Sequence, residues 1–254
     1  MKHVYNDTFF DYINQSARVS AKAMIDFLYP HLNPTSVLDL GCGRGVWLDE
    51  WQRAGVKSVL GVDGEYVDQS QLVIARDHFV AADLSEPFKT GRRFDLAQSL
   101  EVGEHLPPAA ASKLVDSLTS ASDRVLFSAA VKGQGGEFHI NEQMLSYWQG
   151  LFAARGSYPV DCLRPALKTN RAVAPWYRYN TVLYVNEAGR AGLPPAMTAC
   201  ELPQGVELKN GGDLMWKLRC KVVSRLPRQS VTKIAQARAG VLAKHAKWQS
   251  KKAL

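Results

Sequence analysis

Short apolar runs, each ending in a glycine or a polar residue, recur through the first half of the chain. Longer stretches with helical spacing of apolar residues separate them. A run of this kind predicts a buried strand. Strands that alternate with helices predict a parallel sheet with its ligand at the carboxyl ends of the strands. The predicted strands cover residues 36–40, 58–63, 79–84, 94–100 and 124–128.

Helices are expected before and between these strands. The first covers residues 7–29, where Pro30 and Pro34 close an apolar segment that should pack on the sheet. Residues 186–212 contain glycine and proline throughout and predict a loop. Three further helices are predicted at 46–54, 110–120 and 141–154.

The first predicted strand runs into a turn with three glycines, Gly41, Gly43 and Gly45, preceded by Asp39. Glycine lets a backbone approach a ligand closely and adopt positive φ. The spacing differs from the G-x-G-x-x-G of dinucleotide-binding enzymes, which disfavours an NAD-dependent dehydrogenase. The pattern D-x-G-x-G-x-G instead resembles motif I of the class I S-adenosylmethionine (SAM) dependent methyltransferases.

This resemblance covers about residues 36–185 and implies a Rossmann-like α/β fold. The expected sheet is mostly parallel and seven-stranded, with helices on both faces. Its last two strands, at 158–162 and 177–185, should form an antiparallel pair at one edge. The chain would then divide into an N-terminal helical cap (1–34), a SAM-binding domain (35–190) and a C-terminal extension (191–254).

Further polar residues follow the later strands and extend the candidate SAM site. Asp63 lies 18 residues after Gly45, where a carboxylate can accept both ribose hydroxyls, and Gly64 leaves room beside it. The resemblance implies that Asp83, next to Leu84, lies near the adenine amino group. The full set of expected cofactor-binding residues is Asp39, Gly41, Gly43, Gly45, Asp63, Gly64, Asp83, Leu84 and Ser99.

The segment from Glu101 to His105 reads E-V-G-E-H and is the second candidate site. Glu101, Glu104 and His105 have the spacing i, i+3 and i+4, so one helical turn would point all three side chains the same way. Carboxylates and imidazole can bind Mg²⁺ or Mn²⁺. The pattern resembles that of ubiquinone-type O-methyltransferases. It also resembles that of small-RNA 2′-O-methyltransferases, and in the latter a later histidine, here His139, completes a metal site.

Three interpretations of this segment stay open. The four residues Glu101, Glu104, His105 and His139 hold a divalent metal, or His105 or His139 acts as a general base oriented by Glu104, or the residues are structural. A sugar hydroxyl needs a base or a metal to react at neutral pH, so the histidines favour O-methylation. The expected catalytic residues are therefore Glu104, His105 and His139.

The charge is unevenly distributed along the 254 residues. The net charge is +7, but residues 215–254 contain 11 Lys or Arg and no acidic residue, which leaves 20 basic and 24 acidic residues elsewhere. Residues 231–248 predict a basic amphipathic helix. We expect this extension to be a solvated helix or to contact an anionic membrane surface, with nucleic acid as the weaker alternative.

The sequence predicts a cytoplasmic location. The alternative is a peripheral attachment of the protein to the inner face of the membrane. The start of the chain lacks the basic-then-apolar order of a secretory signal, and no apolar run is long enough to cross a bilayer. Four scattered cysteines predict reduced thiols rather than disulfides or a zinc site.

The expected function is transfer of a methyl group from SAM to a hydroxyl of a small molecule or glycan. Residues 135–143, followed by Tyr147 and Trp148, are similar to bacterial methyltransferases of surface-polysaccharide synthesis. The alternatives are an RNA ribose 2′-O-methyltransferase and a non-catalytic partner protein with the SAM-binding fold.

Overall fold

A seven-stranded sheet forms the centre of the computed structural model, which describes residues 7–237 and 240–241, with side chains from residue 16 onward. All strands are parallel except β7, which runs antiparallel to both of its neighbours. The expected α/β fold is confirmed. In sheet order the strands are β3 (Phe79–Ala81), β2 (Ser58–Asp63), β1 (Ser36–Leu40), β4 (Leu96–Leu100), β5 (Arg124–Ser128), β7 (Val182–Val185) and β6 (Tyr158–Val160).

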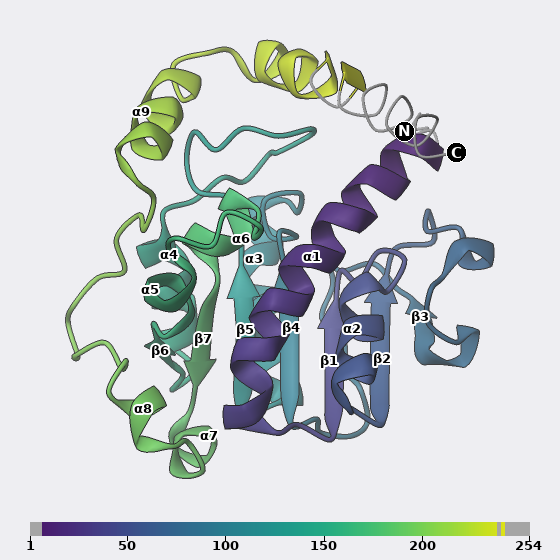
Figure 1. Cartoon of the computed structure of the whole chain (residues 1–254), viewed down its shortest axis with the longest axis vertical. Coiled ribbons are helices and arrows are strands. Elements are labelled where there is room, and N and C mark those ends of the chain that lie inside the picture. The colour runs from purple at the N-terminus through teal and green to yellow at the C-terminus, as the bar shows by residue number, and fades with distance from the viewer. Residues whose placement is uncertain (1–6, 238–239, 242–254) are drawn as a thin grey trace.

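Helices cover both faces of the sheet, which is why its central strands are apolar on both sides. On one face α1 (Asp7–Leu32), α2 (Val46–Ala54) and α5 (Leu163–Leu167) share a core that contains the fully buried Trp51. On the other face α3 (Ala111–Ala121) and α4 (Leu145–Ala153) bury Trp148 and Phe152 against Phe127 of β5. Figure 1 shows α1 crossing the front of the sheet diagonally.

The carboxyl ends of the parallel strands all lie on the same side of the molecule. In Figure 1 the arrowheads of β1, β2, β4 and β5 point upward, whereas that of β7 points downward. The register pairs Asp39 with Gly61 on one side and with Gln98 on the other. The loops that follow β1, β2 and β4 therefore meet at the carboxyl ends of the strands.

Several predicted boundaries were wrong. Strand β3 ends at Ala81 rather than at residue 84, and β4 begins at Leu96 rather than at residue 94. Helix α1 continues through Pro30 to Leu32, because a proline in the last turn removes few hydrogen bonds, and it ends where Asn33 has a φ of 40°. Helix α4 begins at Leu145 instead of 141, because the Asn141 amide bonds to the Glu104 carbonyl. The segment before β7 is helix α6 (Pro175–Asn180), not strand.

The C-terminal third also contains helices where a loop was expected. Between residues 186 and 212 lie α7 (Glu187–Ala191) and α8 (Pro195–Thr198). Helix α9 (Leu214–Val223) follows, and residues 228–237 are again helical. The predicted basic helix at 231–248 lies partly outside the described residues. Three short 3-10 helices complete the described structure: η1 (Gln69–Gln71), η2 (Arg76–His78) and η3 (Pro108–Ala110).

Candidate functional site

The three glycines after β1 all have positive φ: 91° at Gly41, 54° at Gly43 and 84° at Gly45. A Cβ at Gly41 would lie 2.2 Å from Val102, and one at Gly45 would lie 2.7 Å from Ile74, so both positions are closed by packing. A Cβ at Gly43 would meet nothing within 4 Å. Gly43 is therefore the position at which a ligand can approach the backbone.

Asp63, at the end of β2, is fixed beside this loop. Its two carboxylate oxygens accept hydrogen bonds from the Gly43 and Gly64 amides, both at 2.7 Å. The Tyr66 hydroxyl also donates to Asp63. The structure thus brings together the predicted glycine loop and the predicted ribose-binding acid, and a fixed carboxylate next to open backbone fits a ribose diol.

Asp39 lies below the loop and is fully enclosed by the protein. Burial raises its pKa to about 7, although a hydrogen bond with Gln98 acts in the opposite direction. Gln98 is itself held by Trp51, whose indole Nε1 donates to its side-chain oxygen at 2.8 Å. Asp39 therefore supports the loop from the core side, within a network that links β1, β4 and α2.

The remaining predicted cofactor residues have different environments. Asp83 follows β3 and is exposed, and its carboxylate accepts a hydrogen bond from the Ser85 amide at 2.9 Å. The Ala82 amide bonds to the Asp63 carbonyl, which places this turn beside the end of β2. Leu84 is buried in the core. Ser99 is buried within β4, and its hydroxyl has no partner among the described residues.

Glu101 begins the second candidate site with an unusual backbone. Its φ is 58°, and the segment to His105 is a turn rather than the predicted helical turn. The Glu101 carboxylate accepts a hydrogen bond at 2.7 Å from the side chain of Gln134. Gln134 is in turn held by the Asn180 side chain, also at 2.7 Å. Glu101 therefore points toward Gln134.

Glu104, His105 and His139 form a compact cluster. One ligand atom from each lies within 4.8 Å of the others, and the two imidazole rings meet edge to face at 4.8 Å. Glu101 is not part of this group. The Glu104 carbonyl accepts the amides of Ile140 and Asn141, which brings the loop that carries His139 over the end of β4. Three of the four predicted residues are thus brought together.

Glu142 orients His139. One of its oxygens lies 2.9 Å from His139 Nδ1, and the carboxylate accepts the Gly133 amide at 2.8 Å and the Gly135 amide at 2.7 Å. Burial alone would raise the pKa of Glu142, but these hydrogen bonds lower it. Engaging Nδ1 leaves Nε2 as the nitrogen that can accept a proton or bind a metal.

The charge state of Glu104 is set by its surroundings. Only 1% of the residue is exposed, and neither carboxylate oxygen makes a hydrogen bond of good geometry in the described part of the chain, although the backbone amides of Glu104 and Ala130 lie close enough to lower its pKa. Burial raises its pKa well above the usual value, and the negative charge of Glu101 raises it further. Unpartnered buried oxygens are costly. A cation between Glu104 and the two histidines would satisfy them, so the donor set fits a divalent metal.

A family model described as a methyltransferase domain matches residues 12–158, more than half of the chain. The chain belongs to the class I SAM-dependent methyltransferases. A curated relative, malonyl-[acyl-carrier protein] O-methyltransferase from Pseudescherichia vulneris, is 40% identical over 67 residues. This match covers 26% of the methyltransferase chain and 27% of the relative, so the chain spans about a quarter of the length of that protein.

A solved structure shows the same fold. Magnesium protoporphyrin IX methyltransferase from Synechocystis PCC 6803, with bound SAM, is 19% identical with a TM-score of 0.50. That match covers 72% of this methyltransferase and 86% of the other chain. A TehB-like SAM-dependent methyltransferase from Corynebacterium glutamicum is 16% identical with a TM-score of 0.47, covering 66% and 88% of the two chains.

Sequence reasoning did not identify three residues that organise the second site of the methyltransferase. Gln134 holds Glu101, Asn180 holds Gln134, and Glu142 holds His139. Gln134 and Asn180 are 46 residues apart in the chain, and no spacing rule joins them. Glu142 did carry a signal, because a carboxylate three residues after a histidine is close enough to orient it.

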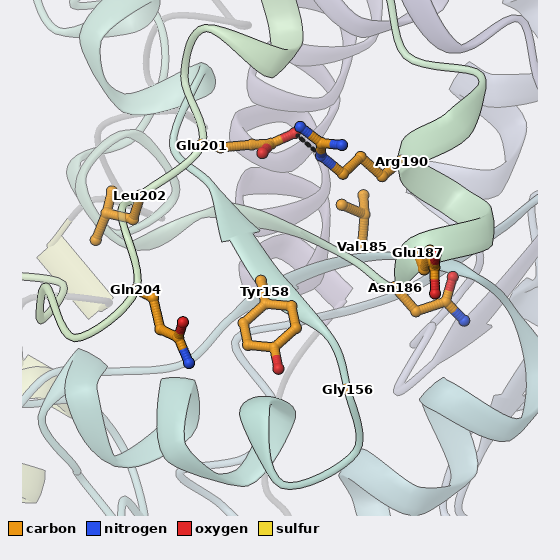
Figure 2. A pocket seen from close by; sticks show the side chains of 9 residues that line it. All are labelled: Gly156, Tyr158, Val185, Asn186, Glu187, Arg190, Glu201, Leu202 and Gln204. Carbon is orange, nitrogen blue, oxygen red and sulfur yellow. Dashed lines mark hydrogen bonds and ion pairs between the residues drawn. The ribbon is translucent and has the colours of Figure 1, made fainter.

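A separate cavity of about 530 Å³ lies beside β6 and β7, at the end of the sheet opposite the glycine loop. It is lined by Tyr158 of β6 and by Val185 at the end of β7. Figure 2 shows the ion pair between Arg190 and Glu201 at its side. Because β7 is antiparallel, its end lies opposite the ends of β1, β2 and β4. This cavity is therefore separate from the glycine loop and from the cluster.

Proposed function

We propose that this protein transfers a methyl group from SAM to a hydroxyl of a small molecule or glycan. The observation that carries the proposal is the cluster of Glu104, His105 and His139, which follows the strand next to the glycine loop. A hydroxyl is a poor nucleophile at neutral pH, whereas an amine needs no comparable activation once neutral. A cluster able to remove or bind a proton therefore favours oxygen as the methylated atom.

SAM, when bound, supplies a methyl group already activated by its sulfonium. The residues that would hold it are the glycine loop, through the open backbone at Gly43, and Asp63, through its carboxylate. Asp83 and Leu84 are the residues that we assign to the adenine. The role of the protein in the transfer is mainly to align the acceptor oxygen with the methyl group and to exclude water.

Two ways of activating the acceptor hydroxyl fit the cluster. In the first, His139 Nε2 accepts the hydroxyl proton, and Glu142 stabilises the imidazolium through Nδ1. In the second, Glu104, His105 and His139 would hold Mg²⁺ or Mn²⁺, which would favour ionisation of the acceptor hydroxyl. The oxygens of Glu104 make no hydrogen bond of good geometry with a described residue, which supports the second way. The 2.9 Å contact between His139 Nδ1 and the Glu142 carboxylate supports both ways.

The acceptor class rests on similarity. The curated relative is named as an O-methyltransferase, which supports oxygen as the acceptor atom. The similarity of residues 135–143 to methyltransferases of surface-polysaccharide synthesis supports a sugar hydroxyl. RNA ribose 2′-O-methylation is the second candidate, because the cluster has the same residue types as the small-RNA enzymes. RNA binding would weaken steeply with salt, and a gel shift at low and high salt tests this.

The test combines binding with turnover. Calorimetry should give micromolar binding of S-adenosylhomocysteine and none of NAD. Radioactive methyl transfer from SAM should then label lipid-linked or free glycans, and Glu104→Gln should abolish the labelling without changing S-adenosylhomocysteine binding. Calorimetric titration with Mn²⁺ alone separates the two ways of activation, because Glu104→Gln should remove metal binding only if a metal is held. Binding without transfer to any hydroxyl would favour a non-catalytic partner protein.

A further inference from the structure

Helix α9 has two apolar faces, of which only one is covered. Asp213 caps the helix by accepting the Trp216 amide at 2.8 Å, and the Tyr179 hydroxyl bonds to the same carboxylate at 3.0 Å. Trp216 and Cys220 are buried in the core shared with α3 and α4. The docked face of the helix is therefore fixed, and the opposite face must point away from the domain.

That opposite face is apolar and exposed. Its residues have spacings that place them within about 100° of arc on the helix. A helix that served only as a solvated cover would be polar on this side. The exposed apolar residues are Leu214 (81% exposed), Met215 (71%), Leu218 (52%) and Val222 (52%).

Basic residues flank the apolar arc. Lys217 and Lys221 are one turn apart and lie on its border, and both are exposed. No acidic residue occurs from residue 214 to the end of the chain. A helix with an exposed apolar face, a basic border and no acidic residue is typical of segments that lie in the interface of an anionic membrane.

Other occupants fit this face less well. A second copy of the chain, related by a twofold axis, would place the same basic border on both sides of the contact. Nucleic acid would pair with the lysines but would leave Leu214, Leu218 and Val222 in contact with phosphates and water. An anionic lipid surface offers negative charge and an apolar layer side by side.

The helix also contacts the loop that organises the candidate site. A Cβ at Gly133 would lie 2.1 Å from the Cys220 carbonyl oxygen, and the Arg219 guanidinium donates to the Gln134 carbonyl. The amide of Gly133 holds Glu142, and the side chain of Gln134 holds Glu101. Figure 1 shows α9 at the upper left, at the end of the molecule toward which β4 and β5 point. The face and the candidate site are thus at the same end of the molecule.

We propose that α9 is a membrane-interface helix that docks this methyltransferase on an anionic lipid bilayer through Leu214, Met215, Leu218 and Val222, with Lys217 and Lys221 contacting the headgroups. Docking in this orientation places the site loop next to the bilayer. The proposal concerns binding alone and does not depend on which acceptor atom is methylated.

The test uses the full-length chain and sedimentation with vesicles of phosphatidylcholine, with and without about one-third phosphatidylglycerol. The wild type should bind only the anionic vesicles. The variant Leu218→Glu/Val222→Glu should bind at least about tenfold more weakly. The matched control is Val19→Glu/Val206→Glu, which changes two apolar residues of similar exposure (44% and 46%) and adds the same charge. The control variant should lose only the small part of its vesicle binding that depends on net charge.

A second measurement locates the contact. In a Cys200→Ser background, Leu214→Cys carries an environment-sensitive fluorophore, and its emission should shift to the blue with anionic vesicles. A label at Val206→Cys should not shift. Unchanged S-adenosylhomocysteine binding and melting temperature show that each variant is folded.

Three outcomes would overturn the proposal. The first is a wild type that does not sediment with anionic vesicles. The second is a Leu218→Glu/Val222→Glu variant that binds as well as its matched control. The third is a wild-type dimer that this variant dissociates without any vesicle binding, which would assign the face to a second copy.

Discussion

The two halves of the site are built in different ways. In the cofactor half, the oxygens of Asp63 are held by the Gly43 and Gly64 amides, all within about 20 residues of one another. In the acceptor half, neither oxygen of Glu104 makes a hydrogen bond of good geometry with a described residue, and His139 reaches the cluster from a distant loop. The carboxylate of the first half is therefore already held in place, whereas that of the second is held less firmly and can respond to a ligand or ion.

The largest effect expected from this comparison is on turnover. Replacing His139 with Ala should lower kcat by about 10²- to 10⁴-fold, because the acceptor proton loses its base or the metal loses a ligand. S-adenosylhomocysteine affinity should stay within about threefold, because His139 belongs to the acceptor half. Steady-state kinetics and calorimetry check this, with His31→Ala or His78→Ala as control, because both histidines are half-buried and lie outside the cluster. Full activity of both His139→Ala and Glu104→Ala would remove the cluster from the mechanism.

The second effect concerns how the stability of the protein depends on pH through Asp39, which lies beneath the glycine loop. The pKa of Asp39 is raised by burial to about 7, so the folded state binds a proton that the unfolded state releases. Stability should therefore fall as pH rises from about 4 to about 7 and change no further above that. Asp39→Asn should remove this dependence and stabilise the protein at alkaline pH by up to about 4 kcal/mol.

Urea unfolding of the wild type and Asp39→Asn at several pH values measures this effect. Asp26→Asn is a suitable control, because Asp26 is exposed on α1, where its carboxylate pairs with Lys22. Parallel pH profiles for the wild type and Asp39→Asn would show that the Asp39 carboxyl is already ionised in the folded protein.

The third effect tests the open backbone of the cofactor half. Gly43→Val should weaken S-adenosylhomocysteine binding by about 100-fold, because its side chain would enter the space that the ligand needs. Gly91→Val is the matched control, since Gly91 also has positive φ (65°) and nothing within 4 Å. Both variants should lose similar stability from backbone strain. Equal affinities in the two variants would place the ligand elsewhere.

The smallest effect expected is at Asp63. Asp63→Asn keeps the size of the side chain but weakens its bonds to the two amides and to a ribose diol, so affinity should fall by about tenfold. Glu65→Gln makes the same charge change two residues away on the surface and should leave calorimetric affinity unchanged. If Asp63→Asn lowered the affinity as much as Gly43→Val, Asp63 would also determine the shape of the glycine loop.

The outcomes of the sequence predictions follow the same division. The strands at 36–40, 58–63 and 124–128 and the helix at 46–54 have the bounds that were predicted. Each is determined locally, by an apolar run and a following glycine or polar residue. In the acceptor half, the expected helical turn at Glu101 was wrong, because the Glu101 amide bonds to the Ser128 carbonyl of β5 instead. That hydrogen bond links residues that no local pattern connects.

Within the described structure, the sequence by itself determined the order of the strands along the chain, the glycine loop and the acid that lies beside it, because these depend on residues close together in the chain. Only the tertiary structure decided which side chains share the second site. It paired Glu101 with Gln134, placed His139 beside Glu104, and left one face of α9 uncovered. These arrangements depend on the packing of loops from different strands, and short-range periodicity carries no information about such packing.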